Sequence, residues 1–75
     1  MAVLIDARGL QCPLPILRVR KMMREVAPGA SVEILATDPG TEQDLHAYCD
    51  AVGADFLSSR KESGGVFRFL IRKAG

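Results

Sequence analysis

A pair of prolines, Pro13 and Pro15, constrains the fold of this 75-residue chain more than any other feature. Proline lacks a backbone N–H and is tolerated in a helix only within its first turn, so the pair predicts a helix that begins at Pro13. Residues 3–5 form a short apolar run that predicts a strand, and a turn follows at residues 6–9. Cys12 therefore lies at a strand-to-helix junction, in the N-cap position of the predicted helix.

This position predicts an activated thiol at Cys12. A sulfur at a helix N-terminus faces free backbone amides and the positive end of the helix dipole, and both favour the thiolate. Such surroundings, with cations such as Arg8 and Arg18 close in sequence, lower a cysteine pKa from about 8.5 to between about 3.5 and 7.5. We expect the two prolines to hold the sulfur rigidly, and we interpret Cys12 as a nucleophile. A cysteine that only caps or packs is the alternative, since free cysteines are usually buried and inert.

The first helix is predicted over residues 13–27, because the helix-breaking pair at residues 28–29 follows. Its apolar stripe, which should face the core, consists of Ile16, Val19, Met23, Val26 and Ala27, with Met22 at the edge. A second group of residues on this helix predicts a docking surface for a partner protein: Leu14, Leu17, Arg18, Lys21 and Arg24. An ordinary solvated helix face is the alternative for this group.

The rest of the chain predicts a strand over residues 31–37, a helix over residues 41–52, and a hairpin of two strands over residues 55–61 and 66–73. Together these elements predict an α+β two-layer sandwich in the order β-α-β-α-β-β, with a mixed four-stranded sheet and both helices on one face. The first two strands should pair in parallel through the first helix. Cys12 then lies at the carboxyl end of a strand, where α/β folds place their sites.

The second helix carries the other cysteine. Cys49 follows Leu45 by four residues on the apolar face, so we interpret it as a packed structural thiol, with a resolving cysteine as the alternative. Asp38 or Thr41 is available to cap this helix, and Gly53 should end it. His46 falls on the polar side without a second histidine at ligand spacing, which argues against a metal site.

Charge is segregated along the chain, although the net charge is only +1. Residues 1–24 carry +4, residues 25–59 carry −7 and residues 60–75 carry +4. The sequence therefore predicts that the cationic part of the molecule surrounds the thiol, where it would steer an acidic protein partner or bind phosphates.

Length and composition predict one domain over residues 1–75, with a single modest core. No signal peptide or membrane span is recognisable, so we expect a cytoplasmic protein. The spacing of the two cysteines matches neither a disulfide framework nor a zinc site. No conspicuous interface stripe is present, and we expect a monomer.

Several segments together resemble the TusA/SirA-like sulfur-carrier family across nearly the whole chain. These segments are Asp6-Ala7-Arg8-Gly9-Leu10-Gln11-Cys12-Pro13-Leu14-Pro15, Lys21, Asp38-Pro39-Gly40-Thr41, Asp44-Leu45, Tyr48-Cys49 and Phe67-Arg68-Phe69-Leu70-Ile71-Arg72-Lys73. His46 departs from the pattern, because some members have a helix-starting proline there. The resemblance implies the same small α/β sandwich, with Asp6, Arg8, Gly9, Pro13 and Pro15 supporting the cysteine.

The resemblance also implies that Cys12 carries sulfur as a persulfide between partner proteins. The donor would be a cysteine desulfurase or a rhodanese-like protein, and a downstream acceptor would pass the sulfur on, for example toward tRNA thiolation. Such a chain is a sulfurtransferase-type carrier rather than a stand-alone enzyme, and it needs no cofactor beyond the covalent sulfur.

Two other classes fit the sequence less well. A small nucleic-acid-binding or regulatory α/β module would be more basic and would expose aromatic residues, and it leaves Cys12 unexplained. A thiol peroxidase or redox switch would need a resolving cysteine, and only Cys49 is available.

Overall fold

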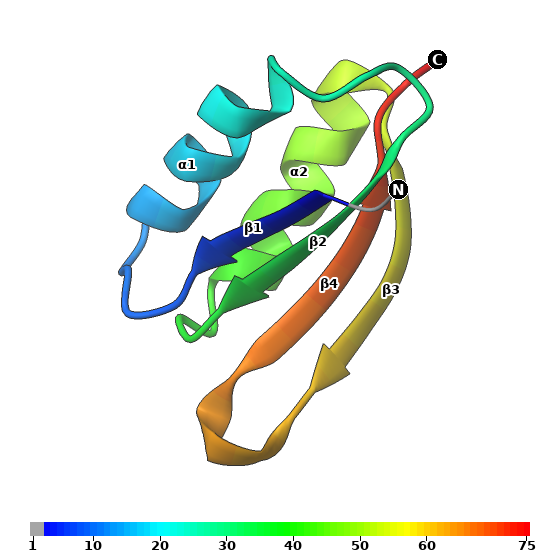
Figure 1. The fold of residues 1–75 in the computed structure, drawn as a ribbon. Helices are drawn as coiled ribbons and strands as arrows, with labels where there is room; N and C mark the ends of the chain where they lie inside the picture. Colours follow the sequence, from blue (N-terminus) through cyan, green and yellow to red (C-terminus); the bar gives the residue numbers. More distant parts are fainter. Residues whose placement is uncertain (1–2) are drawn as a thin grey trace.

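The computed structural model describes residues 3–75. Its elements, in chain order, are β1 (Val3–Ala7), α1 (Leu14–Met23), β2 (Ser31–Ala36), α2 (Thr41–Val52), β3 (Asp55–Lys61), the short 3-10 helix η1 (Ser63–Gly65) and β4 (Phe67–Arg72). The strands form one sheet in the order β1-β2-β4-β3, and both helices cover the same face of it (Figure 1). The predicted fold class and the predicted order of elements are confirmed.

Pairing of the first two strands brings the site together. β1 runs parallel to β2, with Val3 opposite Val32 and Ala7 opposite Ala36, whereas the β2–β4 and β3–β4 pairs are antiparallel. Because parallel strands end at the same edge of a sheet, the loop after β1 lies beside the loop after β2. The backbone N–H of Gly9 in the first loop donates to Thr37 Oγ1 in the second, at 2.9 Å.

The core lies between the sheet and the helices. Its buried members come from β1, β2 and β4, from both helices and from the turn after α1: Ile5, Val19, Met23, Val26, Val32, Ile34, Ala36, Leu45, Cys49, Phe69 and Ile71. Two residues of the predicted stripe depart from it, because Ile16 is only half-buried and Ala27 is exposed. Ile16 borders an open groove between the two helices instead.

Helix α1 ends four residues earlier than predicted, at Met23 rather than Ala27. Beyond that point the chain makes tighter turns, in which the Val26 N–H donates to the Met23 carbonyl three residues back, at 3.2 Å. Lys73 Nζ donates to the Met23 and Val26 carbonyls at 2.8 Å each. A residue near the C-terminus of the chain thus supplies hydrogen-bond donors to the carbonyls at and just after the end of α1. The hydrophobic spacing continues past Met23, which explains why the sequence predicted a longer helix.

Helix α2 has the predicted bounds. Gly53 ends it in the left-handed conformation, with a φ of 76°, as a glycine C-cap does. Its N-cap is Gly40, and no side chain caps it, so the expectation that Asp38 or Thr41 would do so is wrong. Thr41 lies one residue inside the helix and is buried.

Candidate functional site

The loop that carries Cys12 is braced by Asp6. Arg8 donates to both carboxylate oxygens of Asp6, from Nε at 2.9 Å and from Nη2 at 2.8 Å, and its backbone N–H donates at 3.1 Å. These hydrogen bonds lower the pKa of Asp6 to about 2. Arg18 on α1 donates to the Asp6 backbone carbonyl at 2.8 Å, which ties the helix to the end of β1. Gly9 turns the chain with a φ of 80°, a conformation that favours glycine.

Cys12 does not occupy the N-cap of α1. The N-cap is Pro13, the helix begins at Leu14, and the Cys12–Pro13 peptide bond is cis. The Leu14 N–H donates to the Gln11 carbonyl at 2.8 Å, which closes a turn across Cys12. Pro15 lies in the first helical turn, as predicted, and it is buried there. The N-cap prediction for Cys12 is therefore wrong by one residue, and no side chain caps α1.

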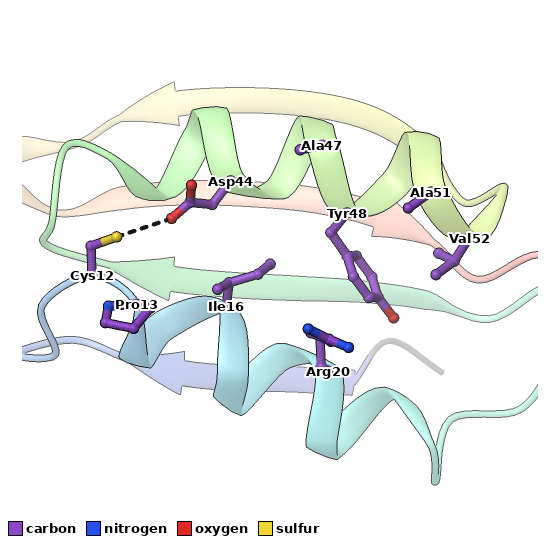
Figure 2. A pocket seen from close by; sticks show the side chains of 9 residues that line it. All are labelled: Cys12, Pro13, Ile16, Arg20, Asp44, Ala47, Tyr48, Ala51 and Val52. Atoms are coloured by element: carbon purple, nitrogen blue, oxygen red, sulfur yellow. Dashed lines mark hydrogen bonds between the residues drawn. The ribbon is translucent and has the colours of Figure 1, made fainter.

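The side chain that forms a hydrogen bond with the Cys12 sulfur carries a carboxylate. Cys12 is exposed, and its Sγ donates to Asp44 Oδ2 of α2 at 3.4 Å (Figure 2). The hydrogen bond to Asp44, partial desolvation, and the negative charges of Asp44 and Asp38 raise the pKa of the Cys12 thiol. The predicted lowering of this pKa is thus wrong in direction. Both arginines invoked for it are directed elsewhere, since Arg8 and Arg18 donate to Asp6.

A groove of about 420 Å³ runs between α1 and α2, with Cys12 at one end. Its lining residues come from both helices: Cys12, Pro13, Ile16, Arg20, Asp44, Ala47, Tyr48, Ala51 and Val52. In Figure 2 the Tyr48 ring reaches across from α2 toward α1, on the side of the groove away from the sulfur. The groove is mostly apolar, with polar groups only at a few positions, and binding clefts share this composition.

The outer face of α1 gathers most of the residues predicted to dock a partner. Leu14 is 50% exposed and Leu17 is 48% exposed. With Arg18 and Lys21 they line a shallow depression of about 490 Å³, to which Leu10 and Met22 also contribute. Arg24 is not part of this depression and lies instead beside Arg20 and Lys73.

The second cysteine is far less accessible than the first. Cys49 is 2% exposed and belongs to the core, as predicted for a structural thiol, and both cysteines are free. Burial raises its pKa, and the nearby Asp50 and Asp55 add to this effect. His46 stacks on Phe56 with ring centroids 3.8 Å apart and lies near Glu42, and it is not among the residues that line the groove with Cys12.

Sequence reasoning assigned no role to Asp44, Arg20 or Tyr48, although all three line the groove with Cys12. A signal for Asp44 was present. If β1 and β2 are parallel neighbours, the helix that follows β2 begins beside the loop that follows β1, so a polar residue in the first turn of that helix faces the loop. Asp44 meets that description.

Within residues 3–75, no three side chains of the metal-binding types come together to hold an ion. No helix in the same range has both the length and the apolar character needed to cross a membrane.

Comparisons with known proteins identify the family of this chain. The sequence model of the family described as "Sulfurtransferase TusA" matches residues 3–73. The chain belongs to the TusA family. Sulfur carrier protein TusA of Allochromatium vinosum is 44% identical over 70 residues, which cover 93% of this chain and 91% of that protein. Sulfur carrier protein TusA of Pseudomonas entomophila is 36% identical over 70 residues, covering 93% and 88%.

A solved structure agrees with the TusA-family fold. The SirA-like protein from Desulfitobacterium hafniense superposes with a TM-score of 0.83 at 26% identity, and the match covers 100% of both chains. The resemblance found in the sequence is therefore confirmed at the level of family and fold.

Proposed function

We propose that this chain is a sulfur carrier that accepts sulfane sulfur as a persulfide on Cys12 and relays it to another protein. The observation that carries the proposal is the contrast between two free thiols in a TusA-family chain, one exposed at the end of a groove and one buried in the core. Relatives named sulfur carrier protein match over almost their whole length, and this supports the relay function.

Loading is a thiol–persulfide exchange. The Cys12 thiolate attacks the outer sulfur of a donor persulfide, a new S–S bond forms, and the donor's own S–S bond breaks. The donor cysteine leaves with the electron pair and takes up a proton, so Cys12 becomes Cys12–S–SH. Attack depends on the thiolate fraction and on access, and departure depends on the acidity of the leaving thiol.

Unloading repeats the exchange with the roles reversed. A thiolate of the acceptor attacks the outer sulfur of the Cys12 persulfide, and Cys12 leaves and is reprotonated. No electron is gained or lost overall, so the cycle needs no cofactor beyond the sulfur that it carries. A resolving cysteine is not needed either, which agrees with the burial of Cys49.

Donor and acceptor are other proteins in this proposal. A cysteine desulfurase or a rhodanese-like protein is the donor class, and the acceptor passes sulfur onward, with tRNA thiolation as one destination. Docking would use the outer face of α1, where Leu14 and Leu17 supply apolar area and Arg18 and Lys21 supply positive charge. Arg24 would contribute only to the longer-range field, because it lies outside that depression.

Intact mass after incubation with a small-molecule persulfide tests the proposal. The wild-type chain and Cys49→Ala should each gain the mass of one sulfur atom, and reduction should remove it. Cys12→Ser should gain none and keep its fold, because the side chain is exposed and serine can donate the same hydrogen bond to Asp44. Sulfur loading by a folded Cys12→Ser variant, or loss of loading in Cys49→Ala, would contradict the assignment.

A further inference from the structure

Asp44 is the one protein group that the structure places in hydrogen-bond contact with the Cys12 sulfur, at 3.4 Å, among the residues described. It lies in the first turn of α2, and its carboxylate forms no ion pair within residues 3–75. No ion-pair partner among the described residues therefore neutralises the charge of Asp44. The other charged or titratable groups near the thiol are Asp38, which adds negative charge, and Arg20 and Tyr48 farther along the groove.

We propose that Asp44 holds unloaded Cys12 as a protonated, weakly nucleophilic thiol, and that a cation carried by the sulfur donor releases the thiolate by pairing with the Asp44 carboxylate. This inference rests on the proposed function and adds a control of when the carrier reacts. Asp44 acts here as a positioning residue, through the proton of Cys12.

The sign of the effect follows from the neutral and charged forms of the thiol. The S–H group can donate to a carboxylate, but a thiolate cannot, and the two negative charges repel each other. Asp44, with Asp38 behind it, therefore raises the pKa of Cys12, and the thiol form dominates near neutral pH. Few molecules then carry the nucleophile, because only the thiolate attacks.

Among residues 3–75, no cation forms an ion pair with Asp44 that would reverse this effect. Arg8 donates to the Asp6 carboxylate and Arg18 to the Asp6 carbonyl, so the two arginines nearest in sequence are already engaged. Arg20 lies on the second turn of α1, along the groove from the sulfur. A lysine or arginine of the donor that approaches Asp44 would weaken both the hydrogen bond and the repulsion, and the pKa of Cys12 would fall only in the complex.

Loading also changes what Asp44 does. In Cys12–S–SH the Sγ atom is bonded to Cβ and to the outer sulfur, so it has no proton to donate to Asp44. Loading therefore removes the hydrogen bond between the Cys12 Sγ atom and Asp44.

The pH dependence of iodoacetamide labelling at Cys12, in a Cys49→Ala background, tests whether Asp44 keeps the thiol protonated. Asp44→Asn should move the midpoint of the rate to lower pH by about one unit or more, since a carboxylate is removed from contact with the sulfur. Asp44→Glu keeps a carboxylate, so its midpoint should lie between those of Asp44→Asn and the parent. Asp50→Asn is the matched control, because it removes the same charge from an exposed position on the same helix, and its midpoint should equal that of the parent.

An unchanged or higher midpoint in Asp44→Asn would overturn the proposal. The parent protein supplies a measurement that needs no Asp44 variant, because its midpoint must lie above that of free cysteine, about 8.5. A parent midpoint below that value would overturn the proposal even if Asp44→Asn failed to fold.

Two small persulfides test whether a cation on the sulfur donor promotes loading. 2-Aminoethyl persulfide carries an ammonium group, and 2-hydroxyethyl persulfide is its neutral counterpart. The wild-type chain should load several-fold faster from the cationic donor, and this preference should shrink in Asp44→Asn to the intrinsic difference between the reagents. An equal preference in both proteins would reject the role of the cation.

The experiments distinguish a failure of the carrier function from a failure of the role of Asp44. If labelling shifts as expected but no persulfide loads Cys12, the proposed function fails and the role of Asp44 in setting thiol reactivity stands. If Cys12 loads normally and the Asp44→Asn profile does not move, the carrier function stands and Asp44 has no such role.

Discussion

Cys12 and Cys49 are the same side chain in two opposite surroundings. Cys12 lies exposed in a loop between β1 and α1, whereas Cys49 lies in α2 with 2% of its surface exposed. The pKa of each thiol is raised, but for different leading reasons: a hydrogen bond to Asp44 acts on Cys12, and burial acts on Cys49.

The difference lies in what can reverse each effect. Burial of Cys49 is removed only when the core opens, at a cost that approaches the stability of the whole domain. The Asp44 carboxylate acts on Cys12 from the surface, so a partner's charge can cancel it without any unfolding. A raised thiol pKa therefore indicates an inert residue in the first case and a controllable one in the second.

Labelling rates should separate the two thiols most strongly. In the folded protein at pH 8, Cys12 should react with iodoacetamide at least about a hundredfold faster than Cys49, because Cys49 must wait for the core to open. Peptide mapping of the labelled sites over time measures both rates. In guanidinium chloride the rates should become equal, and similar rates in the folded state would remove the distinction between the cysteines.

Replacing Cys49 should destabilise the protein more than replacing Cys12. Cys49→Ala should lower the free energy of unfolding by about 1–3 kcal/mol, because it trims a packed core side chain. Thermal unfolding should show this as a Tm lower by about 4 °C or more. Cys12→Ala is the matched control and should change the stability by less than about 0.5 kcal/mol. A larger loss for Cys12→Ala than for Cys49→Ala would mean that Cys12 is the structural residue.

The smallest effect concerns the basic surface of α1. Reversing Lys21 and Arg24 to glutamate should slow sulfur transfer from a donor protein by about fivefold at low salt, if positive charge steers an acidic partner. Arg18 is left in place because it braces the loop through the Asp6 carbonyl. Transfer rates are compared at low and high ionic strength, and the difference should fade as salt screens the charges.

Loading from a neutral small persulfide is the control for that pair of substitutions, and it should proceed at the wild-type rate. If protein-to-protein transfer is also unchanged at low salt, docking depends on the apolar part of the surface, Leu14 and Leu17, and the basic residues are an ordinary solvated face.

Local signals in the sequence were sufficient for the order and type of every strand and both α-helices. The bounds of α2 and β3 agree with the predicted ranges, because glycine turns and hydrophobic periodicity mark their ends. The bounds of α1 do not agree, because its apolar spacing continues through Val26 after the helix has ended. Spacing alone cannot distinguish a last helical turn from the tighter turns that Lys73 stabilises from the far end of the chain.

The sequence by itself determined which thiol is presented and which is packed. Two prolines place Cys12 in an exposed junction, and helical spacing from Leu45 places Cys49 in the core, and both signals act within a few residues. Only the tertiary structure decided the charge beside the exposed sulfur. Asp44 is 32 residues away in sequence and reaches Cys12 because β1 and β2 pair in parallel, which starts α2 next to the loop that carries the thiol. A count of charges along the chain cannot detect that contact, since electrostatic energy depends on distance in space.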